Sequence, residues 1–139
     1  VKQTQWASPD WSLFWLNGDK LVSFCNIVIR EVHINGQVIK VGGLNNMITP
    51  TEHRGKKYST NLLQAFERVI FEDLNLDAGL LLCADNLVPF YHRLNWRKVD
   101  CPVFFEQADG KKQWEANTMM LFNTTPYQPT SIDLNGLPW

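Results

Sequence analysis

The stretch from Asn46 to Leu63 constrains the fold of this chain more than any other. It begins as the end of an apolar strand, passes through a polar turn rich in cations and small residues, and enters an amphipathic helix. Exposed N–H groups at a helix N-terminus attract anions, and Arg54, Lys56 and Lys57 add formal positive charge at this point. Two interpretations stay open: a cradle for a diphosphate, or a solvated basic turn.

The part of the chain before this stretch predicts antiparallel strands joined by tight turns. Trp11–Leu16 is short and strand-like, and the turn Asn17-Gly18-Asp19 leads into a long apolar and β-branched run, Leu21–His33. Apolar residues on both parities of that run predict a strand covered on both faces. Asn35-Gly36, the strongest short hairpin signal in the chain, leads to a return strand, Val38–Ile48.

The return strand and the segments after it predict a βαβ unit. The pair Gly42-Gly43 interrupts the strand and indicates a bulge or a close approach of another segment. Apolar residues recur at helical spacing from Ser59 to Leu74, and Leu80–Cys83 is a short, wholly apolar strand. Strand, helix and buried strand in this order predict that the two strands are parallel.

The remaining third of the chain predicts a second helix and two more strands. Asp85 or Asn86 can cap the helix, and Asn95 can close it in a left-handed conformation. Trp96–Glu106 and Asn117–Asn123 are the expected strands, joined by a polar turn. The tail that follows is apolar enough to pack back on the domain.

Length and composition predict one globular domain, residues 1–139. Hydrophobic residues make up 45% and charged residues 19%, which excludes a disordered chain. The order of elements predicts an α+β fold of the three-layer α/β type. Its central sheet is expected to be mixed but mostly antiparallel, with the βαβ unit inside it.

Composition also excludes several classes of function. The net charge of -1 gives no basic field, so nucleic acid is not an expected partner. No apolar run approaches the roughly 20 residues of a membrane span, and no signal peptide is visible, so we expect a cytoplasmic protein. The three cysteines lack CxxC spacing, which predicts buried reduced thiols. The three histidines are widely spaced, so no metal site is expected.

Two motifs give the chain a resemblance to the GCN5-related N-acetyltransferases (GNAT), a family with an acyl-CoA N-acyltransferase fold. Arg54-Gly55-Lys56-Lys57-Tyr58-Ser59 resembles the family's acyl-CoA loop, which reads Arg or Gln, x, x, Gly, x, Gly or Ala. Pro89–Trp96 resembles the segment that ends Phe-Tyr-x-x-x-Gly-Phe/Trp. The hairpin Glu31–Asn46 and the tail Asp133–Trp139 resemble the branch that contains aminoglycoside and other small-amine N-acetyltransferases.

This resemblance implies transfer of an acetyl group from acetyl-CoA to a primary amine of a small molecule or a protein, by direct attack. It implies that Tyr91 protonates the leaving thiolate, although a stacked core tyrosine is the alternative. For the amine proton two alternatives stay open: His33 or Glu31 acts as the base, or Asn45 with Asn46 positions a water that takes the proton. CoA binding falls to the strand end, the loop and the second helix: Met47, Ile48, Thr49, Arg54, Gly55, Lys56, Lys57, Tyr58, Ser59, Thr60, Asn86 and Phe90.

Three features depart from the family pattern. Lys57 stands at the central glycine of the loop, where its stem crowds a diphosphate or its charge compensates. Asn45 stands where the branch often has a carboxylate, and an amide cannot accept a proton at neutral pH. The family's opening strand and helices have no counterpart before the Trp11 strand, so a sheet face and edge are expected to be bare. A homodimer is therefore expected, with four aromatic residues near its contact: Trp6, Trp11, Phe14 and Trp15.

Two classes of function stay open. The first is an N-acetyltransferase for a small amine, with acetyl-CoA as acyl donor and no metal, and Arg54-Gly55 and Phe90-Tyr91 favour it. The second is a degenerate member of the fold that serves as a binding or interaction module without activity. Lys57 and Asn45 favour this second interpretation.

Overall fold

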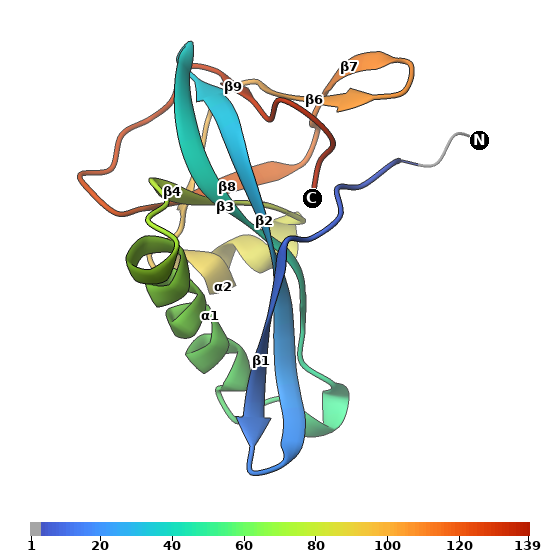
Figure 1. Ribbon diagram of the computed structural model, residues 1–139, viewed down its shortest axis with the longest axis vertical. Coiled ribbons are helices and arrows are strands. Elements are labelled where there is room, and N and C mark those ends of the chain that lie inside the picture. The colour runs from blue at the N-terminus through green and yellow to red at the C-terminus, as the bar shows by residue number, and fades with distance from the viewer. Residues whose placement is uncertain (1–3) are drawn as a thin grey trace.

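The computed structural model describes residues 4–139 (Figure 1). Its first half contains three strands and a long helix that continues into a π-helical turn: β1 (Trp11–Asn17), β2 (Lys20–Ile34), β3 (Gln37–Ile48), α1 (Tyr58–Arg68) and the turn Val69–Asp73. Its second half contains a short helix and six strands: β4 (Ala78–Cys83), α2 (Val88–His92), β5 (Arg97–Lys98), β6 (Val103–Gln107), β7 (Gly110–Gln113), β8 (Asn117–Phe122) and β9 (Ile132–Asp133). Short 3₁₀ turns, Thr51–His53 and Asp85–Leu87, precede the two helices.

The strands form one mixed sheet in the order β5-β8-β4-β3-β2-β9-β6-β7, with β1 paired to β2 alone. β3 and β4 are parallel and flank the connection through α1, so the predicted βαβ unit is confirmed. Most other pairs are antiparallel, as predicted. β1 and β9 pair with opposite ends of the long strand β2, and the sheet curls between those ends (Figure 1).

Local turn signals predicted most of the elements correctly. Asn35 and Gly36 have φ of 53° and 77° and form the hairpin turn between β2 and β3. Asn95 closes α2 with φ 73°, also as predicted. No side chain caps α2; Asp85 instead accepts a hydrogen bond from Asn117 Nδ2 at 2.6 Å.

The prediction of one strand over Trp96–Glu106 is wrong. Two strands occupy this range, and they pair at different places: β5 with β8, and β6 with β7 and β9. Pro102 lies between them and has no N–H to donate to a ladder. The break carries the chain from one end of the sheet order to the other.

Each face of the sheet has its own core. Both helices pack on one face, where Leu62, Leu63 and Phe66 of α1 meet Tyr91 of α2. The other face is covered by β6, β9 and the tail, and its core includes Leu134 and Trp139. The α+β class is therefore confirmed, but the layer opposite the helices consists of strands and tail.

The glycine pair in β3 marks a close approach on both faces. A Cβ at Gly42 would lie 2.7 Å from Ile70 Cγ2, and one at Gly43 would lie 2.8 Å from Trp139 Cδ2. The bulge lies further along the strand, because the β2–β3 register shifts between Phe24 and Asn26. Asn46, with φ 49°, is the left-handed residue in that shifted region.

The prediction of buried thiols holds for two of the three cysteines. Cys25 and Cys83 are buried and Cys101 is half-buried, and all three are free. No helix within residues 4–139 is both long and apolar enough to cross a membrane.

Candidate functional site

A cleft opens where β3 and β4 separate. The two strands pair only from Val41 and Ala78 to Gly43 and Leu80. Beyond that point the bulge at Asn46 turns β3 away, and the space between the strands is a cavity of about 450 Å³. Both strands, α2, the N-terminal segment and the tail line it: Trp6, Ala7, Pro9, Leu44, Asn45, Asn46, Met47, Leu81, Leu82, Cys83, Leu87, Tyr91 and Trp139.

Tyr91 enters the cleft from the helical face of the sheet. Its ring packs edge-on against Phe90 and Trp96, with centroids 5.2 and 6.1 Å away, and the residue is 7% exposed. Within residues 4–139 its hydroxyl has no hydrogen-bond partner. Burial raises the pKa of Tyr91 to about 12, with smaller contributions from Cys83 and Cys25. The phenol therefore keeps its proton at neutral pH and is free to donate it to a ligand.

Asn45 lines the cleft from β3 and is half-buried. It lies opposite Asn26 of β2, whose Oδ1 accepts a hydrogen bond from Ser12 Oγ at 2.7 Å. No carboxylate and no imidazole are among the described residues that line this cleft. Asn45 can orient a water or a polar ligand, but it cannot take a proton itself.

The basic loop has an unusual backbone at two positions. Gly55 has φ 80° and Lys57 has φ 65°, so both are in the left-handed region just before α1 begins at Tyr58. Lysine rarely adopts this conformation, in contrast to the glycine that the family pattern has at this position. Lys57 therefore has a backbone conformation that favours glycine, and it adds an exposed cation.

A chain of hydroxyl groups joins the end of β3 to the start of α1. Thr49 Oγ1 lies 2.5 Å from Ser59 Oγ and 2.8 Å from Ser23 Oγ. Arg54 Nε donates to the carbonyl oxygen of Thr49 at 3.0 Å, which holds the guanidinium beside the helix N-terminus. Among the described residues no side chain caps α1, and the Ser59 hydroxyl contacts Thr49 instead.

The loop surrounds a second, smaller hollow of about 240 Å³. His53 is buried on its wall, and its ring meets Tyr58 edge-on with centroids 6.3 Å apart. The hollow adjoins the cleft because Phe90 lines the hollow and Tyr91 lines the cleft. The complete lining is Thr49, His53, Arg54, Gly55, Lys57, Tyr58, Ser59, Thr60 and Phe90.

Most of the predicted site residues converge on these two spaces. Asn45, Met47 and Tyr91 line the cleft, and eight others line the hollow: Thr49, Arg54, Gly55, Lys57, Tyr58, Ser59, Thr60 and Phe90. Three predicted residues line neither space: Ile48, Lys56 and Asn86. Ile48 is 45% exposed and lies opposite Phe24, while Lys56 and Asn86 are exposed beside the site.

The cleft also contains residues that sequence reasoning did not assign to it. Trp139 closes one end, and only the apolar character of the tail signalled that it would pack back. Of the tryptophans expected near a dimer contact, Trp6 lines the cleft. Trp15 packs instead toward the core beside α1, and Trp11 is 56% exposed.

The arrangement suits a long anionic ligand that ends in a reactive group. Backbone donors and cations at the start of α1 attract phosphate, and the gap between β3 and β4 leaves strand edges that a slender arm can pair with. Within residues 4–139 no three His, Cys, Asp or Glu side chains are grouped to hold a metal ion.

Several solved structures share this fold. A GCN5-related N-acetyltransferase from Kribbella flavida has a TM-score of 0.56 at 20% identity over 63% of this chain and 22% of its own. The N-acetyltransferase YhbS from Escherichia coli, solved in complex with CoA, has a TM-score of 0.59 at 10% identity over 91% of this chain and 68% of its own. The E. coli ribosomal-protein-S18-alanine N-acetyltransferase has a TM-score of 0.53 at 11% identity over 87% of this chain and 69% of its own.

The chain thus spans about a fifth of some structural relatives and about two thirds of others. No curated protein matches it significantly by sequence. Residues 2–99 match the family described as the acetyltransferase (GNAT) domain. That range contains the loop, the bulged strand and Tyr91, and the chain therefore belongs to the GNAT acetyltransferase domain family.

Proposed function

We propose that this chain binds acetyl-CoA and transfers its acetyl group to a primary amine of a small molecule. The observation that carries the proposal is the meeting of two features in adjoining spaces. A cationic loop at a helix N-terminus lies next to a cleft lined by the buried residue Tyr91, whose hydroxyl has no hydrogen-bond partner within residues 4–139. The relative YhbS, solved with CoA, supports CoA as the ligand.

CoA would bind with its two ends in the two spaces. The backbone N–H groups from Gly55 to Thr60 would hold the diphosphate, with charge from Arg54, Lys56 and Lys57. The pantetheine arm would lie in the gap beside Met47, where β3 no longer pairs with β4. This places the thioester near Tyr91.

Acetyl transfer depends on the position of the amine relative to the thioester, and no covalent intermediate with the protein is needed. A neutral amine attacks the thioester carbon, a C–N bond forms, and the C–S bond breaks. Tyr91 donates its proton to the leaving thiolate, because a phenol carries its proton at neutral pH. A water positioned by Asn45 takes the proton that the amine loses.

The residues that line the cleft indicate how much positive charge the acceptor amine carries. An aminoglycoside carries several positive charges, and its recognition would require carboxylates near the acyl group. The described lining has none, and Asn45 and the exposed Trp6 supply amide and aromatic surface instead. We therefore propose a small amine of low charge. The cytoplasmic location stays a prediction from the sequence.

Calorimetric titration with CoA tests the proposal against a module that binds no CoA. We expect saturable binding that Gly55→Val weakens at least tenfold, because valine strains the left-handed loop and disturbs its N–H groups. Gly36→Val is the matched control: Gly36 has φ 77°, and neither glycine has an atom within 4 Å of an added Cβ. Both variants lose similar stability, and Gly36→Val should bind CoA normally. Absence of binding at millimolar CoA would favour the inactive module.

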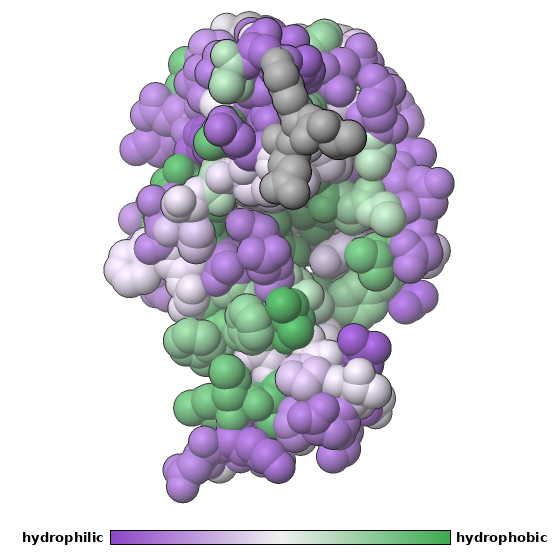
Figure 2. Space-filling view, turned by 90° about the vertical axis from the view of Figure 1, so that its right-hand side faces the viewer, coloured by the Kyte–Doolittle hydropathy of each residue, from purple (hydrophilic) through white to green (hydrophobic). Residues whose placement is uncertain are grey.

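We also propose that the chain forms a homodimer through the part of the sheet where β1 pairs with β2. Figure 2 shows apolar side chains gathered on the lower half of this face. Phe14 pairs with Phe24 across β1 and β2, with ring centroids 6.5 Å apart, and Ile48 continues the same row on β3. Leu16 and Leu21 extend this apolar row; they are 57% and 42% exposed. Exposed aromatic and aliphatic groups in one row are typical of contact surfaces.

A further inference from the structure

Trp139 fills the point where β3 and β4 begin to separate. Its indole lies against Gly43, so closely that any Cβ there would overlap the ring. Gly43 and Leu80 form the last pair between the two strands, and Trp139 Nε1 donates to the carbonyl oxygen of Leu80 at 3.0 Å. The ring is thus fixed at the closed end of the cleft, and it is 4% exposed.

Other contacts hold the Trp139 ring in this place. The Arg30 guanidinium stacks on it, with Cζ 5.1 Å from the ring centroid. Arg30 Nη1 also donates to the carbonyl oxygens of Leu134 and Leu137, at 3.2 and 2.5 Å. The N–H of Ala7 donates to Pro138 O at 2.8 Å, so the tail and the N-terminal segment meet beside the cleft. Figure 1 shows the C-terminus next to that segment.

The cleft is lined from opposite faces of the sheet. Tyr91 belongs to the helical core, whereas Trp139 belongs to the core on the other face. Phe90 and Trp96 fill the space around the Tyr91 ring on the helical side. An acyl group whose sulfur lies at Tyr91 therefore extends across the gap toward Trp139 and Trp6.

We infer that Trp139 limits the length of the acyl group and selects acetyl over longer chains. This inference rests on the proposed function, since it concerns the acyl end of the same cleft. A rigid ring at this end blocks an acyl chain from extending past it toward Gly43, and close-packed interiors do not yield readily. Removing the indole would extend the cavity along Gly43.

Calorimetric titration with CoA, acetyl-CoA and hexanoyl-CoA tests the inference. We expect the wild-type chain to bind hexanoyl-CoA at least tenfold more weakly than acetyl-CoA. Trp139→Ala should shift this ratio by at least about tenfold toward hexanoyl-CoA, because burying two of its four added methylene groups is worth about that factor. Its affinity for CoA without an acyl group should stay within about threefold of the wild-type value.

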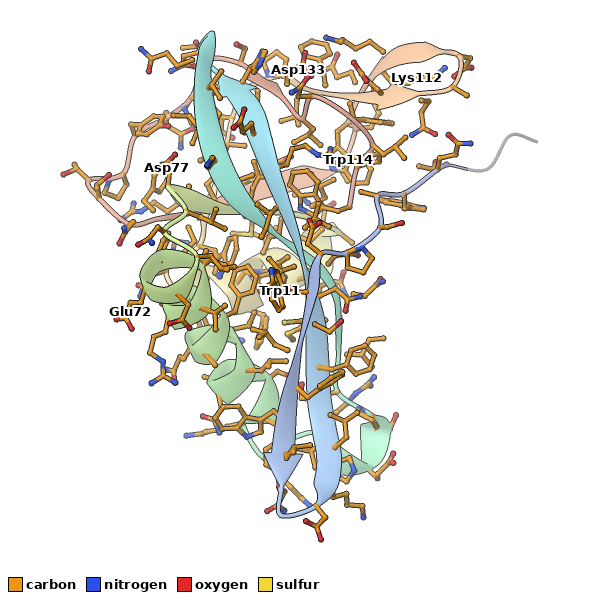
Figure 3. The ribbon with its side chains drawn as sticks, viewed as in Figure 1. Trp11, Glu72, Asp77, Lys112, Trp114 and Asp133 are labelled. Atoms are coloured by element: carbon orange, nitrogen blue, oxygen red, sulfur yellow. The ribbon has the colours of Figure 1, made fainter. Side chains whose placement is uncertain are left out.

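Trp114→Phe is the matched control, because Trp114 packs edge-on against Trp6 with ring centroids 6.1 Å apart, and phenylalanine keeps that aromatic contact while it removes the indole. Trp114 also packs in the core opposite the helices, and its Nε1 also donates to a backbone carbonyl, that of Asn117 at 3.2 Å. It follows β7 and does not line the cleft; Figure 3 labels it below Asp133 and Lys112. This variant should leave the ratio of hexanoyl-CoA to acetyl-CoA affinity unchanged.

The possible results separate the two proposals. If CoA itself does not bind, the proposed function fails. If CoA binds but the wild-type chain takes hexanoyl-CoA as tightly as acetyl-CoA, the role of Trp139 is refuted without any variant. An unchanged ratio in Trp139→Ala refutes it equally. Should Trp139→Ala not fold, Trp139→Phe keeps an aromatic ring in the core and should improve the relative affinity for butyryl-CoA.

Discussion

Replacing Tyr91 with phenylalanine separates a proton donor from a structural tyrosine. The substitution removes one hydroxyl that has no partner within residues 4–139 and keeps the ring contacts with Phe90 and Trp96. A buried hydrogen bond would contribute about 0.5–1.5 kcal/mol to the free energy of unfolding. With no such bond to lose, Tyr91→Phe should change that free energy by less than about 0.5 kcal/mol.

The effect on turnover should be far larger. A positioned general acid contributes roughly 10²-fold or more, which corresponds to about 2.7 kcal/mol of activation free energy. CoA release measured with a panel of primary amines should fall by that factor in Tyr91→Phe. Urea denaturation followed by tryptophan fluorescence gives the stability, and calorimetry gives the CoA affinity. Both should match the wild-type values.

A parallel loss of stability and CoA affinity would refute the catalytic role. Tyr91 would then be a core residue whose hydroxyl supports the fold. Tyr127→Phe is the control, because Tyr127 packs against Phe122 with ring centroids 5.1 Å apart and lines neither the cleft nor the loop hollow. It should leave turnover unchanged.

Two further predictions concern pH and assembly. Burial raises the pKa of Cys25 to about 12 from 9.0, so between pH 9 and 12 the unfolded state loses a proton that the folded state keeps. The free energy of unfolding should therefore fall by up to about 1.4 kcal/mol per pH unit in this range, and urea titrations should show less of this fall in Cys25→Ala. In light scattering at low micromolar concentration we expect a dimer that Phe14→Glu converts to a monomer, since Phe14 is 60% exposed in the apolar row. A wild-type monomer would contradict the proposed interface.

Local signals in the sequence account for most of the fold. The Asn35-Gly36 turn and the apolar spacing of α1 depend on neighbours in the chain, and both predictions are confirmed. The βαβ unit follows from the order of its elements, because a parallel connection needs a crossover. The loop residues converge for the same reason: they lie on one turn between a strand and its helix.

The features that were not predicted from the sequence depend on contacts between residues far apart in the chain. The range Trp96–Glu106 is apolar enough for one strand, but its two halves pair with strands on opposite sides of the sheet order. The bulge at Asn46 depends on the register with β2, which the sequence of β3 alone does not determine. At Gly42-Gly43 the pattern left a bulge and a close approach open, and the structure has the close approach, since both glycines accommodate side chains from other elements.

The width of the cleft follows from these same long-range contacts. Gly43 lets Trp139 reach the last β3–β4 pair, and the indole N–H binds the Leu80 carbonyl there. A larger residue at 43 would push the ring away, so the glycine and the tryptophan are coupled through a single contact between segments far apart in the chain. Beyond the ring, the bulge at Asn46 turns β3 away from β4, so the two features together determine where the gap starts and how far it extends. Family resemblance alone can predict that a gap exists, but its closed end depends on a tail residue that lies outside the range 2–99.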